Sequence, residues 1–210
     1  MDISALADVC HRHGVLLLVD CAHGAYLRFL SPSCHPLDLG ADMACCSAHK
    51  TLPVLTGGAY LHLAPHLPTS LRERAKDALA LFGSTSPSYL ILQSLDAANP
   101  YLEKSFSDAL SRLQGDLERL RGRLMAAGYS LVGEEPCKLT LSAKPYGYTG
   151  EELADRLRRE AIECELSDPD YVVLMPSVKT EGGQTILYLV SNLTDAGLLS
   201  NVLTAASIEA

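Results

Sequence analysis

A lysine and an aspartate whose side chains could act together stand in the first quarter of the chain. Lys50 follows a Ser-Ala-His run, and Asp20 ends an apolar run at positions 15–19. A neutral lysine amine attacks an aldehyde to form a Schiff base, and the apolar residues at positions 52–54 favour the partly desolvated setting that such an amine needs. A carboxylate such as Asp20 keeps a pyridine nitrogen protonated. These are the two groups that pyridoxal 5'-phosphate needs most.

Two neighbours of Lys50 add hydrogen-bond donors. Ser47 and His49 flank it, and a phosphate monoester is a dianion that binds several converging donors, so we expect both to contact the cofactor phosphate. Each residue alone has a plainer explanation: an aspartate at a strand end is more often a cap, and a histidine such as His23 is more often a hydrogen-bonded core residue. The joint order and spacing indicate cofactor chemistry.

Three stretches resemble the Orn/Lys/Arg decarboxylase family, pyridoxal-phosphate enzymes that act on basic amino acids. They cover roughly residues 2–100, and their combination is more specific than any one of them. In order along the chain, they are Leu-Val-Asp-Cys-Ala-His-Gly-Ala at 18–25, the segment 40–53 with Ser-Ala-His-Lys-Thr-Leu-Pro, and the segment 84–98 that begins Ser-Thr-Ser-Pro-Ser-Tyr.

The resemblance implies a role for each matching residue. Lys50 would carry the cofactor, Asp20 would face the pyridine nitrogen, Ala22 and His23 would surround the ring, and Ser47 with His49 would hold the phosphate. Hydroxyls of Ser84 and Thr85 would reach the phosphate of a neighbouring subunit, which implies a homodimer with the site at its interface. The implied reaction removes carbon dioxide from arginine, lysine or ornithine and leaves the amine, with His23 beside the reacting groups and Lys50 or His49 as proton donor.

The chain also departs from the family pattern. Family members carry a long region before the Asp20 strand, which holds a phosphate-binding loop and a ring-stacking side chain, so we expect a relative truncated at its N-terminus. Thr56-Gly57 replaces a Thr-Gln pair, and Cys21 stands where an acidic or polar residue is common. Three hypotheses stay open: an active decarboxylase completed by a separate N-terminal part, an inactive cofactor-binding or regulatory remnant, and a gene fragment. Aminotransferases and lyases of the same fold share the aspartate and the lysine.

Composition favours a cytoplasmic protein with one domain or one and a half. The chain has 210 residues, of which 48% are hydrophobic and 20% charged. A net charge of −8 argues against nucleic acid or an anionic membrane as partner and mildly favours a cationic substrate.

Seven cysteines without a CxxC pair indicate reduced thiols, and we interpret Cys45 and Cys46 as small packing residues. Neither a signal peptide nor a membrane-spanning stretch is expected.

Histidine pairs do not predict a metal site. His11 with His13 and His62 with His66 have the spacing of ligand pairs, but no third Cys, His or Asp ligand stands at zinc-like spacing near them. We therefore predict no metal.

Hydrophobic patterning predicts an α/β large-domain part followed by a small α+β C-terminal domain, and the family resemblance implies that the first part belongs to a fold type I, pyridoxal-phosphate-transferase-like large domain. The expected boundaries are 1–100 for the large-domain part, 101–128 for a connecting helix and 129–210 for the small domain. In the first part, a helix capped by Asp2 and ended by Gly14 precedes a buried strand at 15–20, and further strands are expected at 43–47 and 59–63. Ligands in such sheets bind at the carboxyl ends of the strands.

Helices then dominate to residue 128. One is predicted at 69–81, a second opens at Ser86 and Pro87, and a third carries an apolar stripe from Leu102 to Leu124 and stops at Gly128. Beyond it, a capping box at Thr149 and Glu152 starts a helix, and Thr194 caps the last one. Strands are expected at 129–132, 138–142, 171–175 and 186–191. The acids at Glu163, Glu165 and Asp168 lie in a segment that resembles the family's C-terminal region, which implies that they could hold the distal cation of a substrate; the alternative is a solvated strand edge.

Overall fold

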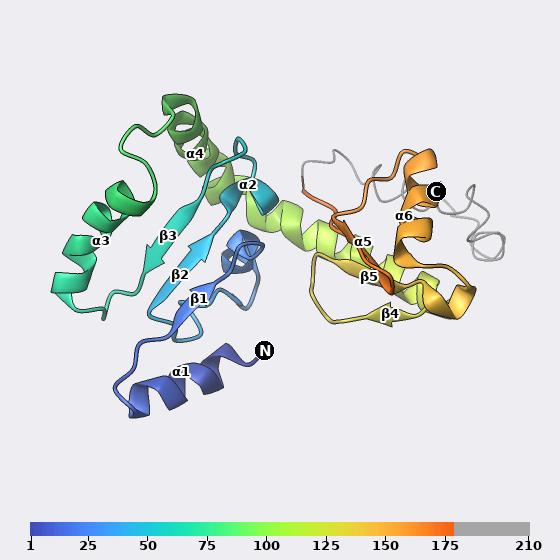
Figure 1. Ribbon diagram of the computed structural model, residues 1–210, viewed down its shortest axis with the longest axis horizontal. Helices are drawn as coiled ribbons and strands as arrows, with labels where there is room; N and C mark the ends of the chain where they lie inside the picture. The colour runs from blue at the N-terminus through green and yellow to red at the C-terminus, as the bar shows by residue number, and fades with distance from the viewer. Residues whose placement is uncertain (179–210) are drawn as a thin grey trace. The chain divides into compact units, whose positions relative to one another are not determined.

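The computed structural model describes residues 1–178 as a mixed α/β protein (Figure 1). The chain divides into two compact units, Met1–Ser107 and Asp108–Ala210. The predicted strand at 186–191 and the helix capped by Thr194 lie outside the described residues. No helix within residues 1–178 combines the length and apolar character needed to cross a membrane.

The first unit is built on a three-stranded sheet. Its strands are β1 (Leu18–Asp20), β2 (Met43–Cys46) and β3 (Tyr60–Leu63), in the order β1-β2-β3. β1 and β2 are parallel, and β2 and β3 are antiparallel, as Figure 1 shows. Because β1 and β2 are parallel neighbours, the residues that follow both strands emerge at the same edge of the sheet.

The helix before β1 begins where the sequence predicts. α1 (Ile3–Arg12) is capped by Asp2, whose Oδ1 accepts a hydrogen bond from the Ala5 backbone N–H at 3.0 Å. Gly14 follows the helix with φ of +66°, a conformation that glycine adopts without steric cost.

The prediction of a buried strand at 15–20 is wrong in its burial. β1 has only three residues, Leu18 is 62% exposed, and Val15 and Asp20 are also exposed. The reason lies in the sheet order, because β1 is an edge strand with β2 on one side. An apolar run indicates a strand, but its burial depends on what covers the sheet.

The two adjacent cysteines of β2 differ in burial. Cys46 is 1% exposed, whereas Cys45 is exposed, so the interpretation of both as packing residues is wrong for Cys45. Successive side chains of a strand point to opposite faces. Ala44 and Cys46 therefore face the core side of the sheet, and Cys45 faces the other side.

The helices that follow the sheet lie where the sequence predicts, but the second of them starts later than expected and runs on into the next helix. α3 (Thr69–Phe82) matches its prediction, whereas α4 (Tyr89–Tyr101) begins after Ser88, later than expected. It continues through a π-helical turn, η2 (Leu102–Phe106), into α5 (Ser107–Ala126). The predicted apolar stripe is confirmed as buried at Leu102, Phe106, Leu110, Leu113, Leu117, Leu120 and Leu124. The helix ends before Gly128, which has φ of +89°.

Besides nearly all of α5, the second unit contains a four-stranded antiparallel sheet and one further α-helix among the described residues. The strands β4 (Leu131–Val132), β5 (Leu139–Ser142), β6 (Leu166–Ser167) and β7 (Tyr171–Leu174) are ordered β4-β5-β7-β6, with a short 3-10 turn, η3 (Lys144–Tyr146), after β5. α6 (Gly150–Arg159) starts with the predicted capping box, in which Thr149 Oγ1 accepts from the Glu152 N–H and Glu152 accepts from the Thr149 N–H.

The acidic segment after α6 makes local contacts. Arg158 Nε donates to Glu163 at 3.3 Å, and Asp168 Oδ1 accepts from the backbone N–H groups of Asp170 and Tyr171. Both carboxylates are engaged next to β6, an edge strand. These contacts favour the strand-edge interpretation of Glu163 and Asp168 over substrate binding.

Candidate active site

The residues singled out around Lys50 come from two adjacent strand ends. Asp20 is the last residue of β1, and Ala22 and His23 follow it. Ser47 follows β2 and is the N-cap residue of the short helix α2 (Ala48–Thr51), which carries Lys50. A backbone hydrogen bond from Ser47 N–H to the Ala22 carbonyl, 3.1 Å long, joins the two segments beyond the strands.

The closest contact across these segments joins a lysine and a histidine. Lys50 Nζ lies 2.8 Å from His23 Nε2, and both side chains are half-buried. The fold thus brings together two residues that are 27 positions apart. In this pair His23 holds the amine of Lys50 at a fixed place.

His49 is oriented by one carbonyl group. The Gly58 carbonyl oxygen lies 2.9 Å from His49 Nδ1 and also accepts the His49 backbone N–H at 3.1 Å. A carbonyl oxygen only accepts hydrogen bonds, so Nδ1 carries the ring proton. In the neutral ring, Nε2 then has a lone pair and acts as an acceptor.

The loop after Lys50 is held by α4. Leu55 N–H donates to Ser94 Oγ at 3.1 Å, and Ser94 Oγ donates to the Ile91 carbonyl at 2.8 Å. A Cβ at Gly58 would come within 3.1 Å of Val54 and of the Leu55 carbonyl. Glycine therefore lets the backbone pack closely at the position whose carbonyl orients His49.

Asp20 and Ser84, two other predicted site residues, form hydrogen bonds with residues other than Lys50. Asp20 is exposed, and its Oδ1 accepts from the Cys45 thiol at 3.6 Å. Ser84 and Thr85 are exposed between α3 and α4, and Ser84 Oγ accepts from the Ser86 backbone N–H at 3.1 Å. These contacts do not link Ser84 to Lys50, and the role of both hydroxyls at a neighbouring subunit stays a prediction.

One hydroxyl in this region was missed by the sequence interpretation. Thr51 Oγ1, next to Lys50, is buried and has no hydrogen-bond partner among the described residues. The hydroxyl of Ser47 makes no hydrogen bond that caps α2. The sequence feature that could have identified Thr51 is its position directly after Lys50.

Two clusters of potential metal ligands also form, contrary to the reasoning that no third ligand is near the histidine pairs. One comprises His35, Cys46 and His62, and the other comprises His11, Asp42 and His66. The predicted pairs are not formed, because His62 and His66 lie in different clusters and His13 lies in neither. Each cluster instead combines residues from distant parts of the chain, which local spacing cannot show.

The cluster around Asp42 is a hydrogen-bonded carboxylate. Asp42 is 1% exposed, and it accepts from His11 Nε2 at 2.9 Å, His66 Nε2 at 2.9 Å and the Leu17 backbone N–H at 2.7 Å. Burial alone would raise the pKa of Asp42, but these three hydrogen bonds outweigh it and hold the pKa below the ordinary value. The cluster ties α1, the start of β1 and the segment after β3 together.

The cluster around Cys46 is more deeply buried. Burial lowers the pKa of both His35 and His62, and their mutual proximity lowers that of His35 further. The pKa of the Cys46 thiol is raised, first by its hydrogen bond with Cys21 and then by burial. Near neutral pH the two imidazoles are therefore uncharged and the thiol is protonated.

Comparison with known proteins assigns the first part of the chain. The family described as Orn/Lys/Arg decarboxylase, major domain, matches residues 1–116, more than half of the chain. The chain belongs to the Orn/Lys/Arg decarboxylase family. This confirms the resemblance carried by the Asp20 and Lys50 segments, and the mixed α/β architecture is consistent with part of a fold type I domain.

Individual relatives match over a wider range. The protein YaaO of Bacillus subtilis, which is uncharacterized, is 35% identical over 184 residues, covering 83% of this chain and 38% of YaaO. An arginine decarboxylase of Halalkalibacterium halodurans is 32% identical over 181 residues, covering 80% of this chain and 36% of the enzyme. A pyridoxal phosphate-dependent protein of Methanothermobacter thermautotrophicus is 27% identical, covering 93% of this chain and 49% of that protein. The chain thus spans little more than a third of the first two relatives.

Proposed function

We propose that the chain carries the lysine-bearing part of a pyridoxal-phosphate site that decarboxylates a basic amino acid. The observation that carries the proposal is the 2.8 Å contact between Lys50 Nζ and His23 Nε2 at the carboxyl ends of two adjacent parallel strands. Membership of the decarboxylase family supports the reaction class.

The chemistry of the residues present fits the cofactor. Lys50 offers a half-buried amine for the aldehyde, and Asp20 offers a carboxylate for the ring nitrogen. The buried Thr51 hydroxyl without a partner and the Ser47 hydroxyl that does not cap α2 are donors suited to a phosphate dianion. We propose that Ala22 and His23 lie beside the ring, and that His49 lies near the phosphate without donating to it, because its Nδ1–H is given to the Gly58 carbonyl.

The residues would divide the chemistry between them. When bound, the cofactor supplies an electron sink for the electrons left when carbon dioxide departs. Asp20 would stabilise the protonated ring nitrogen, and His23 would position the Lys50 amine. His49 is committed through Nδ1–H to the Gly58 carbonyl, so its neutral ring offers a lone pair and not a proton. Lys50 is therefore the favoured proton donor to the substrate carbon.

Family membership and charge support the proposed substrate class, and the assembly is proposed from the resemblance of the Ser84–Thr85 segment. Relatives include proteins named arginine decarboxylase, and the net charge of −8 favours a cationic substrate such as arginine, lysine or ornithine. We propose a homodimer in which Ser84 and Thr85 reach the phosphate of the neighbouring subunit. Turnover by this chain is itself part of the proposal, because the relatives are much longer.

Covalent trapping tests the proposal. The 210-residue chain is mixed with pyridoxal phosphate, reduced with borohydride, and digested for peptide mapping by mass spectrometry. We expect one label per chain, at Lys50, and loss of that label in Lys50→Ala. Lys76→Ala is the matched control, because Lys76 is exposed on α3.

The outcomes separate cofactor binding from turnover. Label spread over several lysines, or retained in full by Lys50→Ala, would contradict the assignment of Lys50. Specific label at Lys50 together with carbon dioxide release from arginine, lysine or ornithine supports the decarboxylase. Specific label without release would instead identify a cofactor-binding chain that lacks turnover.

A further inference from the structure

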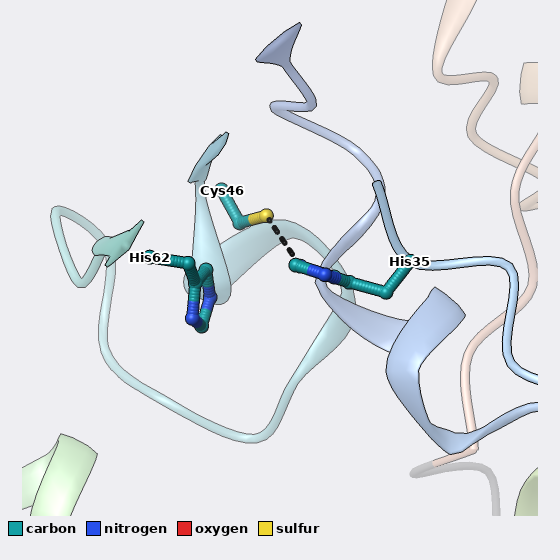
Figure 2. A group of neighbouring side chains, drawn as sticks. All are labelled: His35, Cys46 and His62. Carbon is teal, nitrogen blue, oxygen red and sulfur yellow. Dashed lines mark hydrogen bonds between the residues drawn. The ribbon is translucent and has the colours of Figure 1, made fainter. Parts of the chain in front are cut away.

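We propose that His35, Cys46 and His62 form a binding site for a zinc-like divalent metal ion on the core side of the β1–β3 sheet. The site is separate from the residues assigned to the cofactor, and it does not depend on the proposed function. Figure 2 shows the three side chains converging, with Cys46 and His35 directed toward one another.

Strand register places two of the ligands. β2 and β3 pair with Ala44 opposite His62, and Cys46 lies two residues beyond Ala44 on β2. Because side chains alternate along a strand, Ala44, Cys46 and His62 share one face of the sheet. Ala44 and Cys46 are each 1% exposed, so this face is buried.

The third ligand comes from the segment between η1 (Ala25–Phe29) and β2. His35 is 3% exposed, and its Nε2 lies 3.7 Å from Cys46 Sγ. Its ring meets that of His62 edge-on, with 4.9 Å between ring centroids. Three groups from separate segments thus meet, of which His35 and Cys46 are buried and His62 is half-buried.

The spacing of the ligand atoms fits a tetrahedral ion. With Zn–S near 2.3 Å and Zn–N near 2.0–2.1 Å, tetrahedral geometry places sulfur and nitrogen about 3.5 Å apart. The observed separation of Cys46 Sγ and His35 Nε2 is 3.7 Å, and the ligand atoms of all three residues lie within 4.8 Å of one another. Small side-chain movements would close the site around an ion.

The ligand types select the metal class. A thiolate with two imidazoles suits zinc or cobalt and is unsuited to magnesium or calcium, which prefer oxygen. Burial favours neutral imidazoles, the form that binds metals. The Cys46 thiol would release its proton to solvent as the sulfur–metal bond forms. The fourth position would be filled by water, which leaves Cys46 as the single thiolate ligand.

Binding also requires a proton to move within His35. The Leu37 backbone N–H donates to His35 Nδ1 at 3.3 Å, so without metal the ring proton sits on Nε2 and points at Cys46 Sγ. A metal at Nε2 would shift this proton to Nδ1 and displace the long Leu37 hydrogen bond. Bonds from the metal to His35 Nε2 and to Cys46 Sγ would replace the single N–H···S contact between these two residues.

Cobalt titration of the reduced chain, without pyridoxal phosphate, tests the site. We expect one Co²⁺ per chain, a thiolate-to-cobalt charge-transfer band, and loss of that band when Zn²⁺ is added. Cys46→Ser should abolish the band. Cys45→Ser is the matched control and should retain it, because Cys45 lies on the opposite face of the same strand.

A second ligand variant keeps the test valid if Cys46→Ser misfolds, which far-ultraviolet circular dichroism would reveal. His62→Gln should weaken Zn²⁺ affinity by about tenfold or more, since even indirect metal contacts commonly account for that much. Absence of the band in the unaltered chain, or its survival in Cys46→Ser, would overturn the proposal. Cobalt bound without the band and lost in His66→Gln would place the ion at the Asp42 cluster and would also overturn it.

Discussion

Asp42 shows how a single buried carboxylate can set the stability of the first unit. Its three hydrogen bonds come from His11, Leu17 and His66, which lie up to 31 positions away in the sequence. The pKa of Asp42 is lowered despite burial, so the ionised form is favoured in the folded state. A group with a lowered pKa contributes stability above its unfolded-state pKa and loses that contribution as the pH falls through its folded-state pKa.

Asp42→Asn should therefore lower the free energy of unfolding by roughly 2–4 kcal/mol near neutral pH, because charge-assisted hydrogen bonds to a buried group are lost. The difference from the unaltered chain should shrink below about pH 4, where the Asp42 carboxylate of the unfolded chain begins to take up a proton while the folded one stays ionised. Urea unfolding followed across this pH range measures both effects. Asp8→Asn, at an exposed position on α1, should leave the unfolding midpoint unchanged, and an equal loss in both variants would contradict the assignment.

The sequence predicts which residues form the candidate cofactor site, but it does not predict all of the side-chain clusters that form around the sheet. Asp20 was found because it ends an apolar run and Lys50 because it follows Ser-Ala-His, and both signals are local. His35 and Asp42 were missed as members of clusters, because their partners come from segments that meet only in the folded chain. The different burial of Cys45 and Cys46 follows from strand alternation, once the bounds of β2 are known.

At the scale of elements, the close approach of α6 to its own sheet is the sharpest constraint. A Cβ at Gly150 would lie 2.1 Å from the Asp168 carbonyl oxygen and 2.2 Å from that of Tyr171. Both are backbone atoms, so a side chain could fit only if the start of α6 or the turn before β7 moved.

Gly150→Ala should destabilise the second unit by about 3 kcal/mol or more, because overpacking forces the backbone to shift. Gly122→Ala makes the same chemical change in α5, where a Cβ would meet no atom within 4 Å. It should stabilise that helix by about 0.5–1 kcal/mol. Chemical denaturation of the two variants should thus give shifts of opposite sign, and equal shifts would refute the close approach.

The sequence pattern does not predict the boundaries of the helices accurately. Three serines near α4 could each act as its cap, and the structure begins the helix after Ser88 instead of at Ser86. Pro100 predicts a break, because proline lacks a backbone donor. The helix instead passes through the π-helical turn at Leu102–Phe106, which accommodates the altered hydrogen bonding and keeps the apolar stripe buried.

At the scale of the whole molecule, the division into two units predicts separable stability. The candidate cofactor lysine and both ligand clusters belong to Met1–Ser107, whereas α6 and the four-stranded sheet belong to Asp108–Ala210. Leu157 on α6 is fully buried within the second unit.

Leu157→Ala should destabilise the second unit by about 2–5 kcal/mol, as expected for a buried leucine cavity. Borohydride labelling of Lys50 should persist under conditions where the second unit has begun to unfold. Parallel measurement of circular dichroism and labelling yield checks this, and a simultaneous loss of both signals would mean that the units unfold together.

The edge position of β1 has a consequence for handling the protein. An edge strand presents free backbone N–H and C=O groups that can pair with a strand of another chain, and hydrophobic edges are particularly prone to such pairing. β1 combines that position with the largely exposed side chain of Leu18, next to exposed Val15. Aggregation by intermolecular strand addition would therefore begin at β1, which ends at Asp20, and the concentrated protein would lose access to that carboxylate before it lost its secondary structure.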